Sequence, residues 1–541
     1  MSNKREQMQP NFIVHDSDGV HYWSGEKLIK TIIVHENNHD PDQLITSDDG
    51  NFFAIVYSSH IDVYTDSLQL KTRFDGENIK TVKFSPNSTY LFVHHSSTSN
   101  DPKNKFKIYE LSTENLIHEY ATKSPQSLMR WSKDETIAYK LSGSDIVFYE
   151  KNRFEKCSRQ FSVPKLSTYS FATNRAGSHY IALFIRGKDA LGTVKIHHYP
   201  NTENAVASKS FYKADSVEIK WNHRGDAILI LSSTDHDSSG KSYYGVTMLH
   251  YLNLLNESHT ITGRKEGTVS AAEWLANNDG FLVIQGRMPA EINWYNNRGD
   301  LLHSFGEAAV NTIKLNPFNN LVVFAGFGNL SGNIFVWNLK TKQLISNFRA
   351  NSTTKFFWLA DGQHMITATH FERIRVENGF KLWNYLGSMI HQHECLPETK
   401  LKLHNILPFN RKNDFNEPEI DANVKGHIPE PEKKYVPPGL QSNTVVLTKP
   451  APPLPKFQKS KESKEKKLPQ STKSSTTTEN DPNESSDLKA KKLKNLQKKL
   501  KQIEQLKKNL NEGKVLEKNQ LKKIELEEQI VEEIRLLSIE N

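Results

Sequence analysis

Short runs of apolar residues alternate with polar turns along most of the chain, at the period of two that half-buried strands require. One unit opens with Lys83-Phe84-Ser85-Pro86-Asn87 and closes at the strand end Ile108-Tyr109. Its strands are rich in Val, Ile, Phe and Tyr, and turns of this kind use Gly, Asn, Asp and Ser, which tolerate or cap tight backbone bends. The pattern predicts a body of short β-strands over residues 20–400.

The unit recurs at a nearly constant spacing. The residues that end successive opening strands lie 40 to 53 positions apart; they are Phe84, Trp131, Phe171, Trp221, Trp274, Leu315 and Trp358. The matching later strands end at Tyr109, Tyr149, Tyr199, Tyr251, Tyr295, Trp337 and Trp383, and an earlier unit runs from Leu44 to Tyr64. Four-stranded propeller blades repeat every 40–45 residues or so in WD-repeat proteins. We therefore predict an all-β fold, a WD-repeat-like β-propeller.

The two ends of this region each supply part of a further unit. A closing strand is predicted near residues 13–25, around His21-Tyr22-Trp23, and an opening strand over residues 401–409. Pairing these strands in one blade would close the ring and remove its exposed edges. With eight complete units, the count becomes nine blades. Seven or eight blades with irregular insertions, or two separate β domains, remain alternatives at this point.

The composition changes after the repeats, which divides the chain into three parts. Residues 1–410 form the expected propeller, and residues 411–486 are rich in Pro, Lys, Ser, Thr and Asn. Such a segment buries too little apolar surface to offset its ordering entropy, so we expect a disordered linker. Residues 487–541 return to a helical pattern and form a C-terminal tail.

The tail carries one stripe of apolar residues at helical spacing and one run of lysines. The stripe consists of Leu493, Leu496, Leu500, Ile503 and Leu510. The lysines are Lys489, Lys491, Lys492, Lys494, Lys498, Lys499, Lys501, Lys507 and Lys508. Asn511-Glu512-Gly513 ends or bends this helix, and residues 515–541, with four basic and seven acidic side chains, continue as a second one. A hairpin, a longer helix and a partner-bound pair all fit this pattern.

The net charge of +8 lies entirely in the C-terminal part of the chain. Residues 1–430 hold 46 basic and 46 acidic side chains, whereas residues 431–541 hold 24 basic and 16 acidic ones. A dense lysine helix binds RNA phosphates favourably because it releases counterions. We therefore expect the tail lysines to contact RNA or the ribosome and the apolar stripe to pair with a partner helix, the alternative for the lysines being a solvated face.

Motifs that carry catalysis are missing or incomplete. Residues 326–332 contain three glycines, but the third is one place late for a G-x-G-x-x-G loop and a strand follows, so we expect a turn between two strands. Asp235-His236-Asp237 lies in a polar loop, and His391, His393 and Cys395 share one face of an edge strand that we expect to face water, without a fourth zinc ligand. We predict no catalytic residue, no metal and no cofactor.

The cellular compartment is predicted from the cysteine content and from the lack of signal-peptide and membrane-helix patterns. The two cysteines, Cys157 and Cys395, cannot form a disulfide framework, and residues 1–11 lack the apolar core of a signal peptide. No stretch approaches the roughly 18 apolar residues of a membrane helix. We expect a cytoplasmic protein with no membrane partner.

Several stretches resemble the eukaryotic translation initiation factor 2A family. They are Lys209-Ser210-Phe211-Tyr212-Lys213-Ala214-Asp215, residues 232–235, 242–245 and 325–330, Asp361-Gly362-Gln363-His364, residues 366–369, and Asn378-Gly379-Phe380-Lys381-Leu382-Trp383. Residues 435–440 resemble the short Pro-Pro segment that follows the family's propeller, although Gln441 stands where an arginine is expected. Residues 496–507, 513–514 and 516–521 resemble the family's C-terminal helices.

This resemblance implies a nine-bladed propeller with a basic tail and a non-enzymatic role in translation initiation. The implied partners are the small ribosomal subunit, initiator tRNA and mRNA, with other initiation factors contacted through the C-terminal helices. The implied activity is recruitment of initiator methionyl-tRNA independently of GTP, and initiation on selected mRNAs. A general propeller scaffold for protein assembly without direct RNA binding is the alternative, and a propeller hydrolase is a more distant one.

Overall fold

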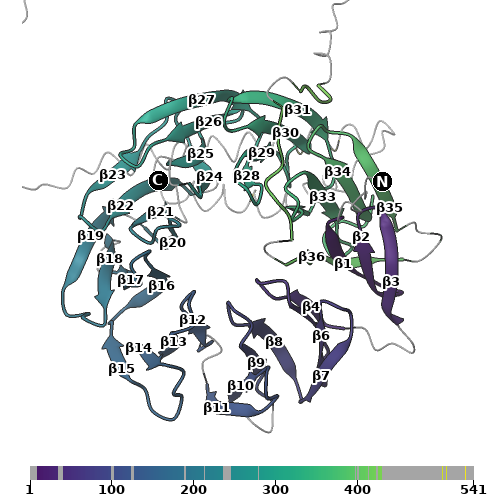
Figure 1. The fold of residues 1–541 in the computed structure, drawn as a ribbon. Helices are drawn as coiled ribbons and strands as arrows, with labels where there is room; N and C mark the ends of the chain where they lie inside the picture. Colours follow the sequence, from purple (N-terminus) through teal and green to yellow (C-terminus); the bar gives the residue numbers. More distant parts are fainter. Residues whose placement is uncertain are drawn as a thin grey trace, which may run out of the picture. The chain divides into compact units, whose positions relative to one another are not determined.

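The computed structural model describes residues 9–34, 41–98, 103–123, 127–187, 191–212, 214–234, 245–277, 280–395, 398, 401–411, 414–421 and 424–428, together with Ile503, Lys507 and Val531. The chain divides into two units, Met1–Tyr435 and Val436–Asn541. The described residues of the first unit form nine antiparallel sheets of four strands each. These sheets are the blades of one propeller, arranged around a common axis (Figure 1).

In eight blades the strands run outward from the axis in chain order; in the ninth, the last described strand is innermost and the first three strands follow it outward. The innermost strands are β4 (Gln43–Thr46), β8 (Ile79–Phe84), β12 (Arg130–Trp131), β16 (Leu166–Thr173), β20 (Ser216–Trp221), β24 (Val269–Trp274), β28 (Thr312–Leu315), β32 (Lys355–Trp358) and β36 (Leu403–Pro408). The second strands are β5 (Phe52–Val56), β9 (Tyr90–His95), β13 (Ile137–Ser142), β17 (His179–Arg186), β21 (Ala227–Ser233), β25 (Phe281–Gln285), β29 (Leu321–Ala325), β33 (His364–Thr369) and β1 (Asn11–Asp16).

The remaining strands complete the blades. The third strands are β6 (His60–Thr65), β10 (Asn104–Glu110), β14 (Asp145–Glu150), β18 (Leu191–Tyr199), β22 (Thr247–Asn253), β26 (Ala290–Tyr295), β30 (Asn333–Asn338), β34 (Gly379–Asn384) and β2 (Gly19–Ser24). The outer strands are β7 (Leu70–Asp75), β11 (Leu116–Thr122), β15 (Arg159–Ser162), β19 (Ala205–Tyr212), β23 (Ser258–Ile261), β27 (Leu301–Ala308), β31 (Gln343–Arg349), β35 (Met389–Glu394) and β3 (Lys27–Val34). We number the blades 1 to 9, from β4–β7 to the blade made of β36 and β1–β3.

Burial falls from the second strand of a blade to the outer strand. The second strand β25 is buried at every position, because neighbouring blades cover both of its faces. The outer strand β11 has no buried position. Strands covered on both faces need continuous apolar sequence, whereas exposed edge strands do not. The repeat seen in the sequence therefore covers the first three strands of each blade and misses the fourth.

The core consists of nine apolar clusters, one at each interface between neighbouring blades. The cluster between blades 6 and 7, for example, joins Leu282 and Ile292 to Val322 and Phe324, all of them buried. The cluster between blades 8 and 9 joins Phe380 to Phe12 and Trp23. Because every interface around the ring is filled, the prediction of one propeller is confirmed and the alternative of two separate β domains is wrong.

Ring closure joins the two ends of the repeat region. Strand β36 pairs with β1 antiparallel, with Ile13 opposite Leu407 and Val14 opposite Ile406. The prediction that residues near both ends share the ninth blade is confirmed. The N-terminal contribution is larger than expected, however, because it supplies three strands, β1–β3, rather than a single closing strand.

A segment that we call the strap, residues 411–428, continues from the closing blade. The Arg411 guanidinium pairs with Asp66, and the Asn320 side-chain amide donates to Glu417 Oε1 at 3.1 Å. Further along, Gly426 N donates to Ile345 O at 2.8 Å, and Asn347 N donates to His427 O at 2.7 Å. The strap thus leads from blade 9 to blade 7, where its backbone forms hydrogen bonds with the outer strand β31 (Figure 1).

The strap changes the predicted domain boundary. A disordered linker was expected from residue 411, yet the described strap residues lie against the propeller with backbone hydrogen bonds. The reason is that main-chain hydrogen bonds, the side-chain pairs of Arg411 and Glu417, and the packing of Ile420 on an apolar cluster of blades 7 and 8 together fix a segment that is otherwise poor in apolar residues. The rest of the predicted linker, residues 429–486, lies outside the described residues.

Candidate functional site

The predicted RNA-binding tail is almost entirely outside the part of the chain that the structure describes. Of its lysines, only Lys507 is described, and it is exposed in helical backbone. Of the apolar stripe, only Ile503 is described; it is buried and also helical. The other lysines and leucines of the tail therefore stay predictions.

The histidines considered as metal ligands pack against an aromatic side chain instead. His391 and His393 lie in β35, with their ring centroids 5.3 and 5.7 Å from that of Trp23 in the next blade. Cys395 is buried, and burial raises the pKa of its thiol to about 12. Strand β35 is the outer edge strand, as expected, but these histidines face blade 9 rather than water. Among the described residues, no group of three or more His, Cys, Asp or Glu side chains could hold a metal ion.

The glycine-rich stretch forms the predicted turn, here between β29 and β30. A Cβ on Gly326 would lie 2.2 Å from Ala309 O, and one on Gly332 would lie 2.2 Å from Ala350 O. These glycines are therefore explained by close contacts with the backbone of the connections before and after blade 7 rather than by a phosphate. Asp235-His236-Asp237 lies outside the described residues.

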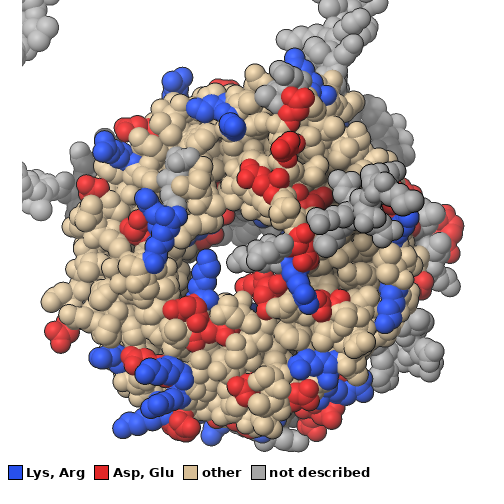
Figure 2. Space-filling model, in the orientation of Figure 1, with Lys and Arg blue, Asp and Glu red and all other residues tan. Residues whose placement is uncertain are grey.

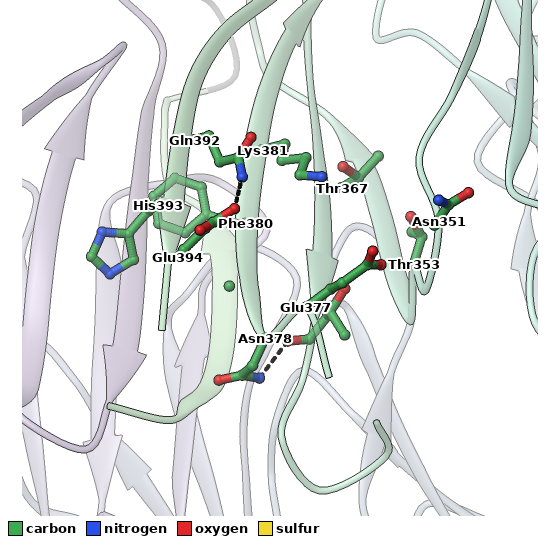
Figure 3. A pocket seen from close by; sticks show the side chains of 12 residues that line it. Asn351, Thr353, Thr367, Glu377, Asn378, Phe380, Lys381, Gln392, His393 and Glu394 are labelled. Carbon is green, nitrogen blue, oxygen red and sulfur yellow. Dashed lines mark hydrogen bonds between the residues drawn. The ribbon is translucent and has the colours of Figure 1, made fainter. Parts of the chain in front are cut away.

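A small polar pocket lies in blade 8, at the end of the blade where β33 turns into β34 (Figure 3). Its volume is about 80 Å³, and it is lined by side chains that include Thr353, Lys381 and Glu394. Asn378 Nδ2 donates to Thr369 O at 2.6 Å at one end of it. The pocket has room for a few water molecules, and its polar groups bond to each other.

The propeller has two faces that differ in what covers them. One face, which we call the strap face, is made by the turn between the first and second strands of each blade and the turn between its third and fourth strands. The other, the open face, is made by the turn between the second and third strands and by the blade-to-blade connections. The strap lies on the strap face, because its contacts Asp66, Asn320 and Leu386 all belong to turns of that face.

The strap face carries mixed charge. Figure 2 shows lysine and arginine side chains interspersed with aspartate and glutamate over this face. The sequence of the strap holds four carboxylates, Asp414, Glu417, Glu419 and Asp421, against three cations, Arg411, Lys412 and Lys425. Because Arg411 is paired with Asp66, the strap adds little that would attract a polyanion to this face.

Two larger pockets open on the open face. One, of about 330 Å³, lies in blade 2 and is lined by Lys103, Lys105 and Lys107 together with Glu77 and His95. His95 Nδ1 bonds to Glu77 O at 2.8 Å, and burial lowers the pKa of this ring. The second pocket, of about 450 Å³, lies where blades 8, 9 and 1 meet.

A turn with two exposed arginines borders the second pocket, and the sequence did not single it out. This turn, Phe371–Glu377, joins β33 to β34 and exposes both Arg373 and Arg375. Arg375 Cζ lies 5.7 Å from the centroid of the Phe371 ring, and Lys402 Nζ lies 4.8 Å from it. The paired arginines are visible in the sequence, but the contact with Lys402 depends on ring closure.

The described residues include no helix that is long and apolar enough to cross a membrane.

Comparison with known proteins identifies relatives over much of the propeller. The family model described as "Eukaryotic translation initiation factor eIF2A" matches residues 209–400. The eukaryotic translation initiation factor 2A of Drosophila melanogaster is 32% identical over 378 residues, which cover 66% of this chain and 59% of the relative. That of Dictyostelium discoideum is 29% identical over 454 residues, which cover 81% of this chain and 74% of the relative.

A solved structure supports the fold. A crystal structure of the eukaryotic initiation factor aligns with a TM-score of 0.64 at 22% identity, covering 75% of this chain and 100% of the solved one. The chain spans about three fifths of the length of the Drosophila melanogaster relative, 59%. The matched residues nevertheless extend across the repeats that the sequence predicted, and they agree with the family that its motifs indicated. The chain belongs to the eukaryotic translation initiation factor 2A family.

Proposed function

We propose that this protein is a cytoplasmic, non-enzymatic translation initiation factor that acts on the small ribosomal subunit. The observation that carries the proposal is the 32% identity to a eukaryotic translation initiation factor 2A over 66% of this chain. The basic tail supports it, because dense positive charge favours contact with ribosomal RNA.

In its finer form, the proposal is that the factor recruits initiator methionyl-tRNA without GTP and promotes initiation on selected mRNAs. The glycine-rich turn is compatible with an activity that does not use GTP. Its glycines are explained by close approach to the carbonyl oxygens of Ala309 and Ala350, and no nucleotide phosphate is needed to account for them. The propeller would then act as a rigid platform, and the tail lysines would bind RNA.

Co-sedimentation with small ribosomal subunits tests the proposal. Full-length protein and a version ending at Asn480 should be compared across a salt series. We expect the full-length protein to sediment with the subunits, and its binding to fall steeply as salt rises, because phosphate contacts release counterions. Absence of the full-length protein from the subunit fraction at low salt would contradict the proposal.

A scaffold without direct RNA binding is the second candidate, and the apolar stripe of the tail favours it. Leu493, Leu496 and Leu500 would pair with a partner helix through apolar contacts. Binding through the stripe should survive nuclease treatment and moderate salt. The same salt series therefore separates the two candidates, as does replacement of the stripe leucines by serine with every tail lysine kept.

A further inference from the structure

We propose that the turn Phe371–Glu377, together with Lys402, is an RNA phosphate-binding site on the open face of the propeller. This inference rests on the proposed function, because it names the part of the propeller that would lie against RNA. It also assigns the docking face. Four properties of the turn support it: its exposure, the pairing of Glu372, its rigidity and the chemistry of its cations.

The turn is exposed on this face. Arg373, Arg375 and Glu377 are exposed, and Val376 keeps 65% of its surface exposed. Neither guanidinium has an ion-pair partner within the described residues. Both arginines therefore keep their donors available to an external anion.

One of the two acidic residues of the turn, Glu372, is already bonded. Glu372 Oε1 lies 2.5 Å from His404 Nδ1 in β36. Burial raises the pKa of Glu372, but the bond from His404 outweighs this effect, so that the pKa lies below its usual value. Burial, with smaller contributions from the positive charges of Lys355 and Arg373, lowers the pKa of the nearby His370 to about 4. Glu372 is therefore engaged by His404, and Glu377, at the other end of the turn, is the exposed carboxylate that remains beside the two arginines.

The turn is fixed to the closing blade at both ends. Phe371 N donates to Leu403 O at 3.0 Å, and Leu403 N donates to Asn378 Oδ1 at 2.7 Å. Inside the turn, Arg373 N and Ile374 N donate to His370 O at 3.2 and 3.1 Å. A site held in this way gives up little conformational freedom on binding.

The chemistry of the turn fits a phosphodiester backbone. Arginine offers planar donors that match phosphate oxygens, and an aromatic ring beneath the cations keeps them in place. Arg375 and Lys402 lie 5.7 and 4.8 Å from the Phe371 ring centroid, so two cations from two segments share one ring. An acidic protein surface would find the same charges, and we treat it as an outcome of the test. RNA is favoured because the tail of this chain carries a lysine run suited to the same polyanion.

The test uses the full chain with Arg373→Gln and Arg375→Gln combined. The probes are small ribosomal subunits and a single-stranded RNA of about 20 nucleotides. Each neutralised phosphate of a single strand contributes roughly 0.7 to the slope of log affinity against log salt, so we expect the slope to decrease by about 1.4 when both arginines are replaced. Binding at moderate salt should weaken by about tenfold.

A matched control removes two exposed cations from the strap face, Arg153→Gln combined with Lys156→Gln, and we expect it to bind like the parent. Unchanged melting temperatures would establish that both variants are folded. An unaltered salt slope in the Arg373 and Arg375 variant would overturn the site, whether or not the affinity falls. A weaker affinity with an unaltered slope would indicate a protein contact instead. Either result leaves the proposed function standing if the unmutated chain still binds the subunits. Failure of the unmutated chain to bind the small subunits would instead contradict the proposed function.

Discussion

At the scale of single residues, close backbone approaches explain where the chain requires glycine. Gly50, in the turn between β4 and β5, has φ +73°, and a Cβ there would lie 1.9 Å from Asn410 O. That carbonyl belongs to the chain just after the closing strand β36. The glycine therefore allows the end of the ring to pack on blade 1. Its positive φ is a second reason why a residue with a side chain is disfavoured at this position.

We expect Gly50→Ala to destabilise the propeller by roughly 3 kcal/mol, from the backbone strain plus the clash. Gly143 provides the control, because it has φ +66° and nothing within 4 Å of its Cβ position. Gly143→Ala should cost only the strain of about 1–2 kcal/mol. Urea unfolding of the two variants measures the difference, and equal destabilisation would show that the contact with Asn410 does not matter.

Buried histidines make the folded state less stable at acid pH. His250 Nδ1 lies 3.0 Å from Thr260 Oγ1 and its Nε2 lies 3.2 Å from Ser232 Oγ. Burial, with a smaller effect from Lys209, lowers the pKa of His250 to about 4 from the usual 6.5. The unfolded chain therefore binds a proton more readily, so this stability is complete above pH 6.5 and is lost as the pH falls toward 4.

Between pH 7 and pH 5 this residue alone should cost about 2 kcal/mol of unfolding free energy. His250→Gln should be less stable than the parent at pH 7 but should lose about 2 kcal/mol less on going to pH 5. Urea midpoints at the two pH values provide the measurement. A parallel decrease in both proteins would mean that His250 is not a source of the acid sensitivity.

At the scale of elements, a strand can be predicted from the sequence more clearly the more of its side chains are buried. The second strand of blade 5, β21, reads Ala-Ile-Leu-Ile-Leu-Ser-Ser and is buried at its first six positions. The outer strand β23 has three exposed positions out of four, and no pattern distinguishes it from a loop. Edge strands form because their backbone completes the sheet, and backbone hydrogen bonding leaves no periodic signature in the side chains.

The strap escaped prediction for the same physical reason. Its hydrogen bonds to Ile345, Asn347 and Leu386 use main-chain groups. The candidate RNA-binding turn was missed for a different reason. Arg373 and Arg375 are visible in the sequence, but Lys402 reaches Phe371 only because β36 returns to the ring beside blade 8.

Gly426→Val should release the end of the strap. A Cβ at this position would lie 2.2 Å from Leu386 O, and the extended chain could relieve the clash only by moving away from blade 8. We expect faster amide hydrogen exchange at Gly426, His427 and Asn347, with little change in the blade cores. Lys425→Ala, at an exposed neighbouring position, should leave these amides protected. Protection retained in the Gly426 variant would mean that the strap tolerates a side chain there.

At the scale of the whole molecule, the propeller combines a continuous core with unequal faces. Nine filled interfaces close the ring, and the strap covers part of one face with added carboxylates. The opposite face offers the turn Phe371–Glu377, whose two exposed guanidinium groups have no ion-pair partner among the residues that the structure describes. A propeller arranged in this way can present one face to a polyanion while the strap occupies the other.

The central claim is that this factor docks on the small ribosomal subunit through its open face. Electron cryo-microscopy of the full chain bound to small subunits measures this orientation directly. We predict density for the propeller with the Phe371–Glu377 turn against ribosomal RNA and the strap facing solvent. Particles in which the strap face contacts the subunit, or in which no propeller is bound under conditions that retain other initiation factors, would contradict the account.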